Sequence, residues 1–381
     1  MSSPDQSHRS DQSGSLWWLV GGQLGAHRAE WLAGVVDVHP AGAADTGASV
    51  PRSVLAQALG IVLFDDLLAR VPSAAAYVEE KASRGETVHL DHGAVRTVSG
   101  VDCGQLPAGQ ESVTRVLAAL GYTHRFTYDL TRLRMTGRSW CHLDLPEAIP
   151  QYFVSELHAG LFSAPFQEAA ARVLGSSRDP LDPAVTARLA ELRSRRSLGL
   201  EDAAALLPVL VSCFGRQHSV PDLADYQALL AESEEMAWIA TEGTVCNHMT
   251  DRVADVAAVA EAERVAGRPI KDAVEVSGSG RIRQTAHRAP LVARSFGMGG
   301  VGGVGGAEGE REGEGGDGAG GGDGVGGGGQ GGRISRDVPG SFFEFITRAP
   351  LPDGSGLDLA FDAANAQQIF AMTRGDRASR R

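Results

Sequence analysis

Residues 87–98 read TVHLDHGAVRTV, and this stretch contributes most to the expected fold. Apolar and polar residues alternate roughly along it, as in a strand whose side chains point in turn to the two faces of a sheet. His92, Ala94 and Arg96 then share one face, with the Cα atoms of His92 and Arg96 about 13 Å apart at ~3.3 Å per residue. In a helix, residues four apart would also share a face. Either way, an imidazole and a guanidinium point into the same space.

Strand-like and helical segments alternate along the rest of the chain. Further strand-like runs, which mix β-branched, aromatic and polar residues, occupy 277–285 and 341–347. Residues 139–164 have mixed spacing and are interpreted as a strand followed by a helix. The sequence therefore predicts an α+β protein with a helix-rich part at residues 146–240. Helical periodicity occupies 53–70, 111–120, 184–195, 200–214 and 223–239.

Length and composition set limits on the domain organisation. The 381 residues are 43% hydrophobic and 22% charged, which suits one large domain or two ordinary ones. We expect residues 1–15, which are polar, to form a disordered tail and residues 16–381 to form one catalytic domain. Residues 299–332 are mostly glycine with scattered acidic residues. Such a stretch has few side chains to bury, so it is expected to be a flexible loop.

The overall charge and the cysteines exclude several classes of protein. A formal net charge of −12 argues against a nucleic-acid-binding protein, which would carry clustered Lys and Arg. No apolar run approaches the roughly 20 residues that span a bilayer, so no membrane association is expected. The four cysteines form no CxxC pair and are typical of reduced thiols in a cytoplasmic protein. The oligomeric state cannot be deduced from the sequence.

Two later segments carry residues that can bind a metal. Residues 246–253 read CNHMTDRV, in which His248 and Arg252 are again four apart. Residues 341–348 read SFFEFITR, in which Glu344 lies between two phenylalanines that would face the core. A lone buried carboxylate is costly, so Glu344 needs a partner. Either a metal ion or Arg348 would supply it.

Together, His92, His248 and Glu344 can form a metal site. Two histidines and one carboxylate from three strands make the facial triad that suits non-haem Fe(II), and this triad leaves positions open for substrate and O₂. Taken singly, a histidine in an alternating strand is more often a hydrogen-bonded core residue than a ligand. The hypothesis of an iron site therefore depends on the three residues occurring as a set.

Four segments, taken together, resemble a known family. They read DHGAVRTV at 91–98, AWIATEGTVCNHMTDRV at 237–253, SGSGRIRQTA at 277–286 and PGSFFEFITR at 339–348. In this order they resemble the 2-oxoadipate dioxygenase/decarboxylases, also called 2-hydroxyglutarate synthases, of the vicinal oxygen chelate superfamily. The glycine tract at 299–332 interrupts the family's usual spacing. Phenylalanines at 342 and 343 replace a tyrosine pair that is common in the family.

The resemblance implies a fold, a metal site and a reaction. The fold would be paired βαβββ modules that form an open barrel around the metal, with a helical insertion. The metal would be Fe²⁺ held by His92, His248 and Glu344, and Arg96 would bind a substrate carboxylate beside His92. The reaction would convert a 2-oxo diacid and O₂, most simply 2-oxoadipate to 2-hydroxyglutarate and CO₂ in lysine degradation.

Two other functions remain open at this point. The same superfamily contains other metalloenzymes, such as ring-cleaving dioxygenases and isomerases, and a fold does not fix a function. A non-catalytic protein of the same fold that binds a small ligand is the second alternative.

Overall fold

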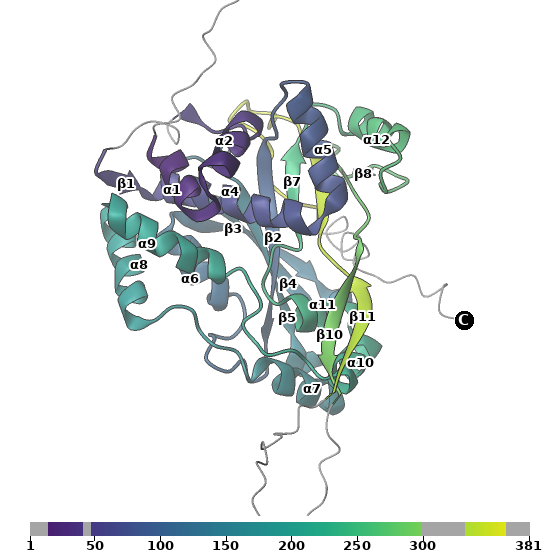
Figure 1. The fold of residues 1–381 in the computed structure, drawn as a ribbon. Helices are drawn as coiled ribbons and strands as arrows, with labels where there is room; N and C mark the ends of the chain where they lie inside the picture. The colour runs from purple at the N-terminus through teal and green to yellow at the C-terminus, as the bar shows by residue number, and fades with distance from the viewer. Residues whose placement is uncertain (1–13, 41–46, 299–331, 363–381) are drawn as a thin grey trace, which may run out of the picture.

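The fold is built on one curved sheet of eight strands. The computed structural model describes residues 14–40, 47–298 and 332–362. The strand order is β3-β4-β5-β2-β7-β12-β9-β8, which makes a half-barrel flanked by helices (Figure 1). The expected α+β class is confirmed. The strands are β2 Leu90–Ser99, β3 Tyr122–Leu130, β4 Met135–His142, β5 Gln151–His158, β7 His248–Arg252, β8 Glu275–Val276, β9 Ile282–Ala286 and β12 Phe342–Arg348.

The sheet consists of two βαβββ modules, as the family resemblance implies. The first runs β2, α6 (Glu111–Ala119), β3, β4 and β5, and the second runs β7, α12 (Val256–Val265), β8, β9 and β12. The modules meet where β2 and β7 pair antiparallel, with His92 opposite Thr250 and Ala94 opposite His248. This register is symmetric, so a two-fold rotation that places β2 on β7 also places His92 on His248. No repeat in the sequence indicates this duplication.

Helices cover both faces of the sheet and form two hydrophobic cores. Val95, Met249 and the Phe343–Phe345 pair face the larger core, on the outer side of the sheet. The smaller core lies on the inner side, where Ala94 and Phe153 pack. Besides α6 and α12, the outer helices are α1 Ser15–Leu24, α2 Ala26–Val35, α4 Arg52–Arg70, α5 Pro72–Ser83, α8 Pro183–Arg195 and α9 Leu200–Ser212. The inner helices are α7 Ala164–Leu174, α10 Leu223–Glu232 and α11 Glu234–Glu242.

Two short two-stranded sheets complete the described structure. One pairs β1 (Ser49–Pro51) with β6 (Ser197–Gly199), and the other pairs β10 (Leu291–Gly297) with β11 (Arg333–Pro339). The expected glycine-rich loop lies between β10 and β11 and, apart from Gly332, falls outside the described residues. The expected tail at 1–15 also lies outside them, except that Gly14 is described and Ser15 begins α1. Within the described ranges, no helix is long and apolar enough to cross a membrane.

Two predictions about secondary structure are wrong. The single helix predicted over 223–239 is two helices, because Ser233 is extended and its hydroxyl caps α11 by accepting a hydrogen bond from the backbone N–H of Met236. Residues 139–164 contain β4 and β5, with a helix only from Ala164, so the helix-rich part starts later than residue 146. β5 lies between two strands in the sheet. Its short apolar run has no clear alternation, and such a run does not distinguish a strand from a helix.

Candidate metal centre

The three predicted metal ligands meet on the inner face of the sheet. His92 on β2, Thr250 on β7 and Glu344 on β12 are neighbours across adjacent strands. His248 precedes Thr250 by two positions and therefore points to the same face. All three ligand atoms lie within 4.8 Å of one another. Oε2 of Glu344 is 3.1 Å from Nε2 of His92 and 3.4 Å from Nε2 of His248.

The donor set and its burial fit a divalent metal ion. The exposed fractions of His92, His248 and Glu344 are 2%, 4% and 1%. Oε2 of Glu344 accepts a hydrogen bond from the Thr250 hydroxyl at 2.9 Å, but buried Oε1 has no hydrogen-bond partner. Such an atom is costly unless something satisfies it. A cation between two imidazoles and this carboxylate would do so, and two histidines with one carboxylate are the donors of non-haem Fe(II) sites.

The pKa values of the cluster show how it holds a proton without a metal. Burial lowers the pKa of His92, but the carboxylates of Asp91 and Glu344 raise it, and the net result is above the ordinary value. Burial lowers the pKa of His248 to about 3. Burial raises the pKa of Glu344, but the two histidines and Thr250 lower it to below its usual range. Without a metal, the two shifts therefore favour a proton on His92 beside an ionised Glu344.

A β-bulge places Asp91 beside His92. Leu90 pairs with Asp251 and His92 with Thr250, so Asp91 is an extra residue in β2. Nδ1 of His92 donates to Oδ1 of Asp91 at 2.8 Å. A carboxylate in this position fixes the ring and leaves Nε2 for the metal. The sequence pattern does not indicate this role, because strict alternation places neighbouring residues on opposite faces.

Arg348 pairs with Asp91 and not with Glu344. Its Nε lies 3.0 and 2.9 Å from the two Asp91 oxygens, and its Nη2 lies 2.9 Å from Oδ1. Both side chains are almost completely buried. Of the two partners considered for Glu344, the metal ion therefore fits and Arg348 does not.

The ring of His248 is held by its neighbours. Phe342 stacks on it with a centroid distance of 4.8 Å and an interplanar angle of 28°. Nδ2 of Asn247 lies 3.0 Å from Nδ1 of His248, while the buried Oδ1 of Asn247 has no hydrogen-bond partner. Turning the amide over would let Oδ1 accept the Nδ1 proton. That arrangement satisfies both groups and leaves Nε2 of His248 available to a metal ion.

Arg96 lies on the same face of β2 as His92 and is fully buried. Its guanidinium carbon lies 4.7 Å from the centre of the Trp238 ring. Burial lowers the pKa of Arg96 to about 10, although the charge of Glu235 opposes the shift. The guanidinium therefore remains protonated at neutral pH. Arg252, its counterpart in the second module, instead binds His89 and the carbonyl of Glu147.

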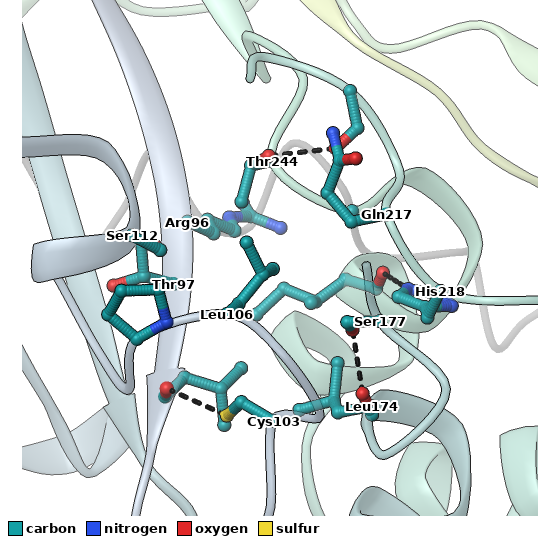
Figure 2. A pocket seen from close by; sticks show the side chains of 15 residues that line it. Arg96, Thr97, Cys103, Leu106, Ser112, Leu174, Ser177, Gln217, His218 and Thr244 are labelled. Carbon is teal, nitrogen blue, oxygen red and sulfur yellow. Dashed lines mark hydrogen bonds between the residues drawn. The ribbon is translucent and has the colours of Figure 1, made fainter. Parts of the chain in front are cut away.

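Arg96 also lines a pocket that contains none of the three metal ligands (Figure 2). The pocket lies between the end of β2 and the loops that follow β2, α7 and α9. The hydroxyls of Ser177 and Thr244 in its wall donate to the backbone carbonyls of Leu174 and Gly215. Arg96 therefore contributes both to the face of β2 that carries His92 and to the wall of this pocket.

The family assignment agrees with this fold and site. The sequence model of the 2-oxoadipate dioxygenase/decarboxylase family matches residues 61–314, which is two thirds of the chain. The chain therefore belongs to this family. The matched range includes His92, Arg96 and His248 and ends before Glu344. Among curated proteins, none matches this chain.

Three solved structures share the fold. A Ralstonia eutropha JMP134 protein, provisionally described as a member of the glyoxalase superfamily, is 45% identical; the alignment covers 92% of this chain and 98% of that one, with a TM-score of 0.80. The Oryza sativa hydroxyglutarate synthase in complex with 2-oxoadipate is 18% identical, with coverages of 91% and 97% and a TM-score of 0.61. A provisionally assigned hydrolase from Shewanella frigidimarina NCIMB 400 is 22% identical, with coverages of 81% and 98% and a TM-score of 0.55. At these identities the last two show the fold alone.

Proposed function

We propose that this protein is a non-haem Fe(II) dioxygenase that oxidatively decarboxylates and hydroxylates a 2-oxo diacid. The proposed reaction is 2-oxoadipate + O₂ → 2-hydroxyglutarate + CO₂, in which six carbons become five plus one and both sides carry seven oxygens. The observation that carries the proposal is the buried convergence of His92, His248 and Glu344 within 4.8 Å. Family membership supports 2-oxoadipate as the substrate. The rice hydroxyglutarate synthase, which shares the fold, is in complex with 2-oxoadipate.

The three ligands would hold Fe(II) through Nε2 of His92, Nε2 of His248 and the carboxylate of Glu344. When bound, the metal supplies a point of chelation for the 2-oxo acid and a means of activating O₂. The protein contributes the orientation of the ligands. The Asp91 carboxylate holds the ring of His92, and the stacked Phe342 ring holds that of His248.

Arg96 would bind the distal carboxylate of the substrate. A guanidinium can make two parallel charge-assisted hydrogen bonds to a carboxylate, and such pairs are among the strongest side-chain contacts. Trp238 limits the movement of Arg96 by lying against its guanidinium. The 2-oxo acid end at the metal and the distal carboxylate at Arg96 would thus fix both ends of the substrate.

Burial would keep water away from the reacting groups. All three ligand side chains and Arg96 lie in the interior, where charge interactions are less screened than in water. A dry site protects reactive species from side reactions.

Two alternatives from the sequence are less well supported. The complete donor set disfavours a non-catalytic ligand-binding protein, and a buried cation on the metal-bearing face disfavours a neutral phenolic substrate. We further propose that the described residues act as a single catalytic domain. A cytoplasmic location and a role in lysine degradation remain predictions.

The metal assignment is tested by His248→Ala. The wild-type protein, loaded anaerobically, should bind one equivalent of Fe(II), and the variant should bind none while keeping the circular dichroism spectrum of the wild type. His124→Ala, at an exposed histidine on β3, is the matched control and should bind iron normally. A His248→Ala variant with full iron content and full activity would refute the assignment.

A further inference from the structure

The segment that follows β12 places Phe361 against His92 of the candidate metal centre. The ring of Phe361 meets the ring of His92 edge to face, with a centroid distance of 4.8 Å and an interplanar angle of 79°. Its backbone N–H donates to the hydroxyl of Tyr128 at 2.8 Å. The ring also packs 5.2 Å from that of Phe153. Phe361 is thus an apolar neighbour of a predicted metal ligand.

The two modules differ at this place. Glu344 is opposite Thr250 in the second module, and Phe153 is opposite Ala94 in the first. When the first module is superposed on the second, Ala94 corresponds to Thr250. Phe153, which is opposite Ala94, therefore corresponds to Glu344, which is opposite Thr250. The first module therefore has an aromatic ring where the second has the ligand carboxylate, and Phe361 extends this apolar side.

The guanidinium of Arg348 contacts both the partner of His92 and the segment that carries Phe361. Nε and Nη2 of Arg348 bind Asp91, which orients His92. Nη1 donates to the carbonyls of Asp358 and Ala360, both at 2.8 Å. The guanidinium carbon lies 5.0 Å from the centre of the Phe361 ring. Arg348 thus contacts both the support of His92 and the segment that carries Phe361.

We propose that Arg348 is a positioning residue that couples metal binding to substrate selection. Through Asp91 it orients the metal-binding ring of His92, and through the carbonyls of 358 and 360 it holds Phe361 as a wall beside that ring. The wall favours an unbranched methylene chain next to the metal and excludes acids with a side branch there. The inference depends on the proposed function for the metal and for the class of substrate.

Separate variants test the two effects, metal binding through Asp91 and substrate selection through Phe361. Asp91→Asn should weaken metal binding by about 10- to 100-fold, the usual effect of losing the partner of a ligand histidine. Phe361→Ala should leave the metal dissociation constant within about threefold. It should raise kcat/KM for 2-oxoadipate methylated at C3, relative to 2-oxoadipate, by about tenfold or more, since one methyl group in an apolar pocket has an effect of this size.

Arg348 itself is tested by Arg348→Lys, which keeps the charge but loses the planar fork. Both effects should appear together in this variant. Arg281→Lys is the matched control, because Arg281 binds the Asp358 carboxylate and makes no contact with Asp91. It should leave the metal dissociation constant unchanged.

Hydrogen exchange tests the coupling even if Arg348→Lys does not fold. Anaerobic loading of the wild type with Fe(II) should slow exchange of the amides at 357–362, and Asp91→Asn should reduce this protection. Unchanged exchange on metal loading, or wild-type metal affinity in Asp91→Asn, would overturn the coupling. If the wild type itself binds no metal, the proposed function is wrong, and this inference, which depends on it, is wrong as well.

Discussion

Replacing Arg96 with methionine should remove the preference for a substrate with two carboxylates. Arg96 is fully buried, and its pKa of about 10 keeps it charged at neutral pH, so solvent does not screen its contact with a carboxylate. Each hydrogen bond to a charged group contributes about 1.5–3 kcal/mol. Two such bonds make the loss about 3 kcal/mol or more, which is roughly a hundredfold in kcat/KM.

The assay compares two substrates in two proteins. The values of kcat/KM for 2-oxoadipate and for 2-oxohexanoate, which lacks the distal carboxylate, are measured in the wild type and in Arg96→Met. The variant should lose about two orders of magnitude on the diacid and little on the monoacid. Methionine can keep a contact with the Trp238 ring through its sulfur, so the fold should survive.

A matched control separates this effect from a general loss of positive charge. Arg138 lies on β4 of the same sheet and pairs with Glu156 at 3.2 Å. Arg138→Met should leave the ratio between the two substrates unchanged. If Arg96→Met keeps the wild-type ratio while folded, Arg96 does not bind the distal carboxylate and the substrate assignment loses its main structural support.

Two further predictions concern protons and packing. Metal-free His92 has a raised pKa and holds a proton that the metal must displace, whereas His248, with a pKa of about 3, is already neutral. Metal affinity should therefore rise by about tenfold per pH unit as the pH rises towards the pKa of His92, and then level off. Metal titrations at several pH values measure this slope. A rise of about a hundredfold per pH unit would mean that both histidines release protons. In Gly137→Ala the new methyl carbon would lie 2.3 Å from Cζ of Phe153, an overpacking that costs about 1–3 kcal/mol and should lower the melting temperature. An unchanged melting temperature would show that the Phe153 ring moves aside without cost.

The sequence predicted the site best where strand alternation is regular. In β12, Phe343 and Phe345 face the outer core, with the ring of Tyr77 lying 5.8 and 4.9 Å from theirs, and this leaves Glu344 on the inner face as expected. In β2, alternation correctly placed His92 and Arg96 on one face. The period of two is a local property of the backbone, so it can be read from a few residues.

Features that depend on register or on distant contacts were not predictable. The bulge at Asp91 is a shift in the register of β2 against β7 between Leu90 and His92, and it depends on both strands. The symmetry of the two modules appears in the pairing of β2 with β7 and in no recognisable sequence repeat. The placement of Phe361 beside His92 depends on hydrogen bonds from Arg348 to carbonyls ten and twelve residues away. Backbone carbonyls are present at every residue, so a sequence pattern cannot identify which ones an arginine will bind.

Oxygen consumption by the anaerobically purified, Fe(II)-loaded protein given 2-oxoadipate tests the central claim most directly, with the products identified by mass spectrometry. The proposed function predicts that one O₂ is consumed for each CO₂ and each 2-hydroxyglutarate formed, and that His248→Ala shows none of this. An iron-loaded wild type that consumes no O₂ with 2-oxoadipate, or that forms a different product, would contradict the proposed reaction.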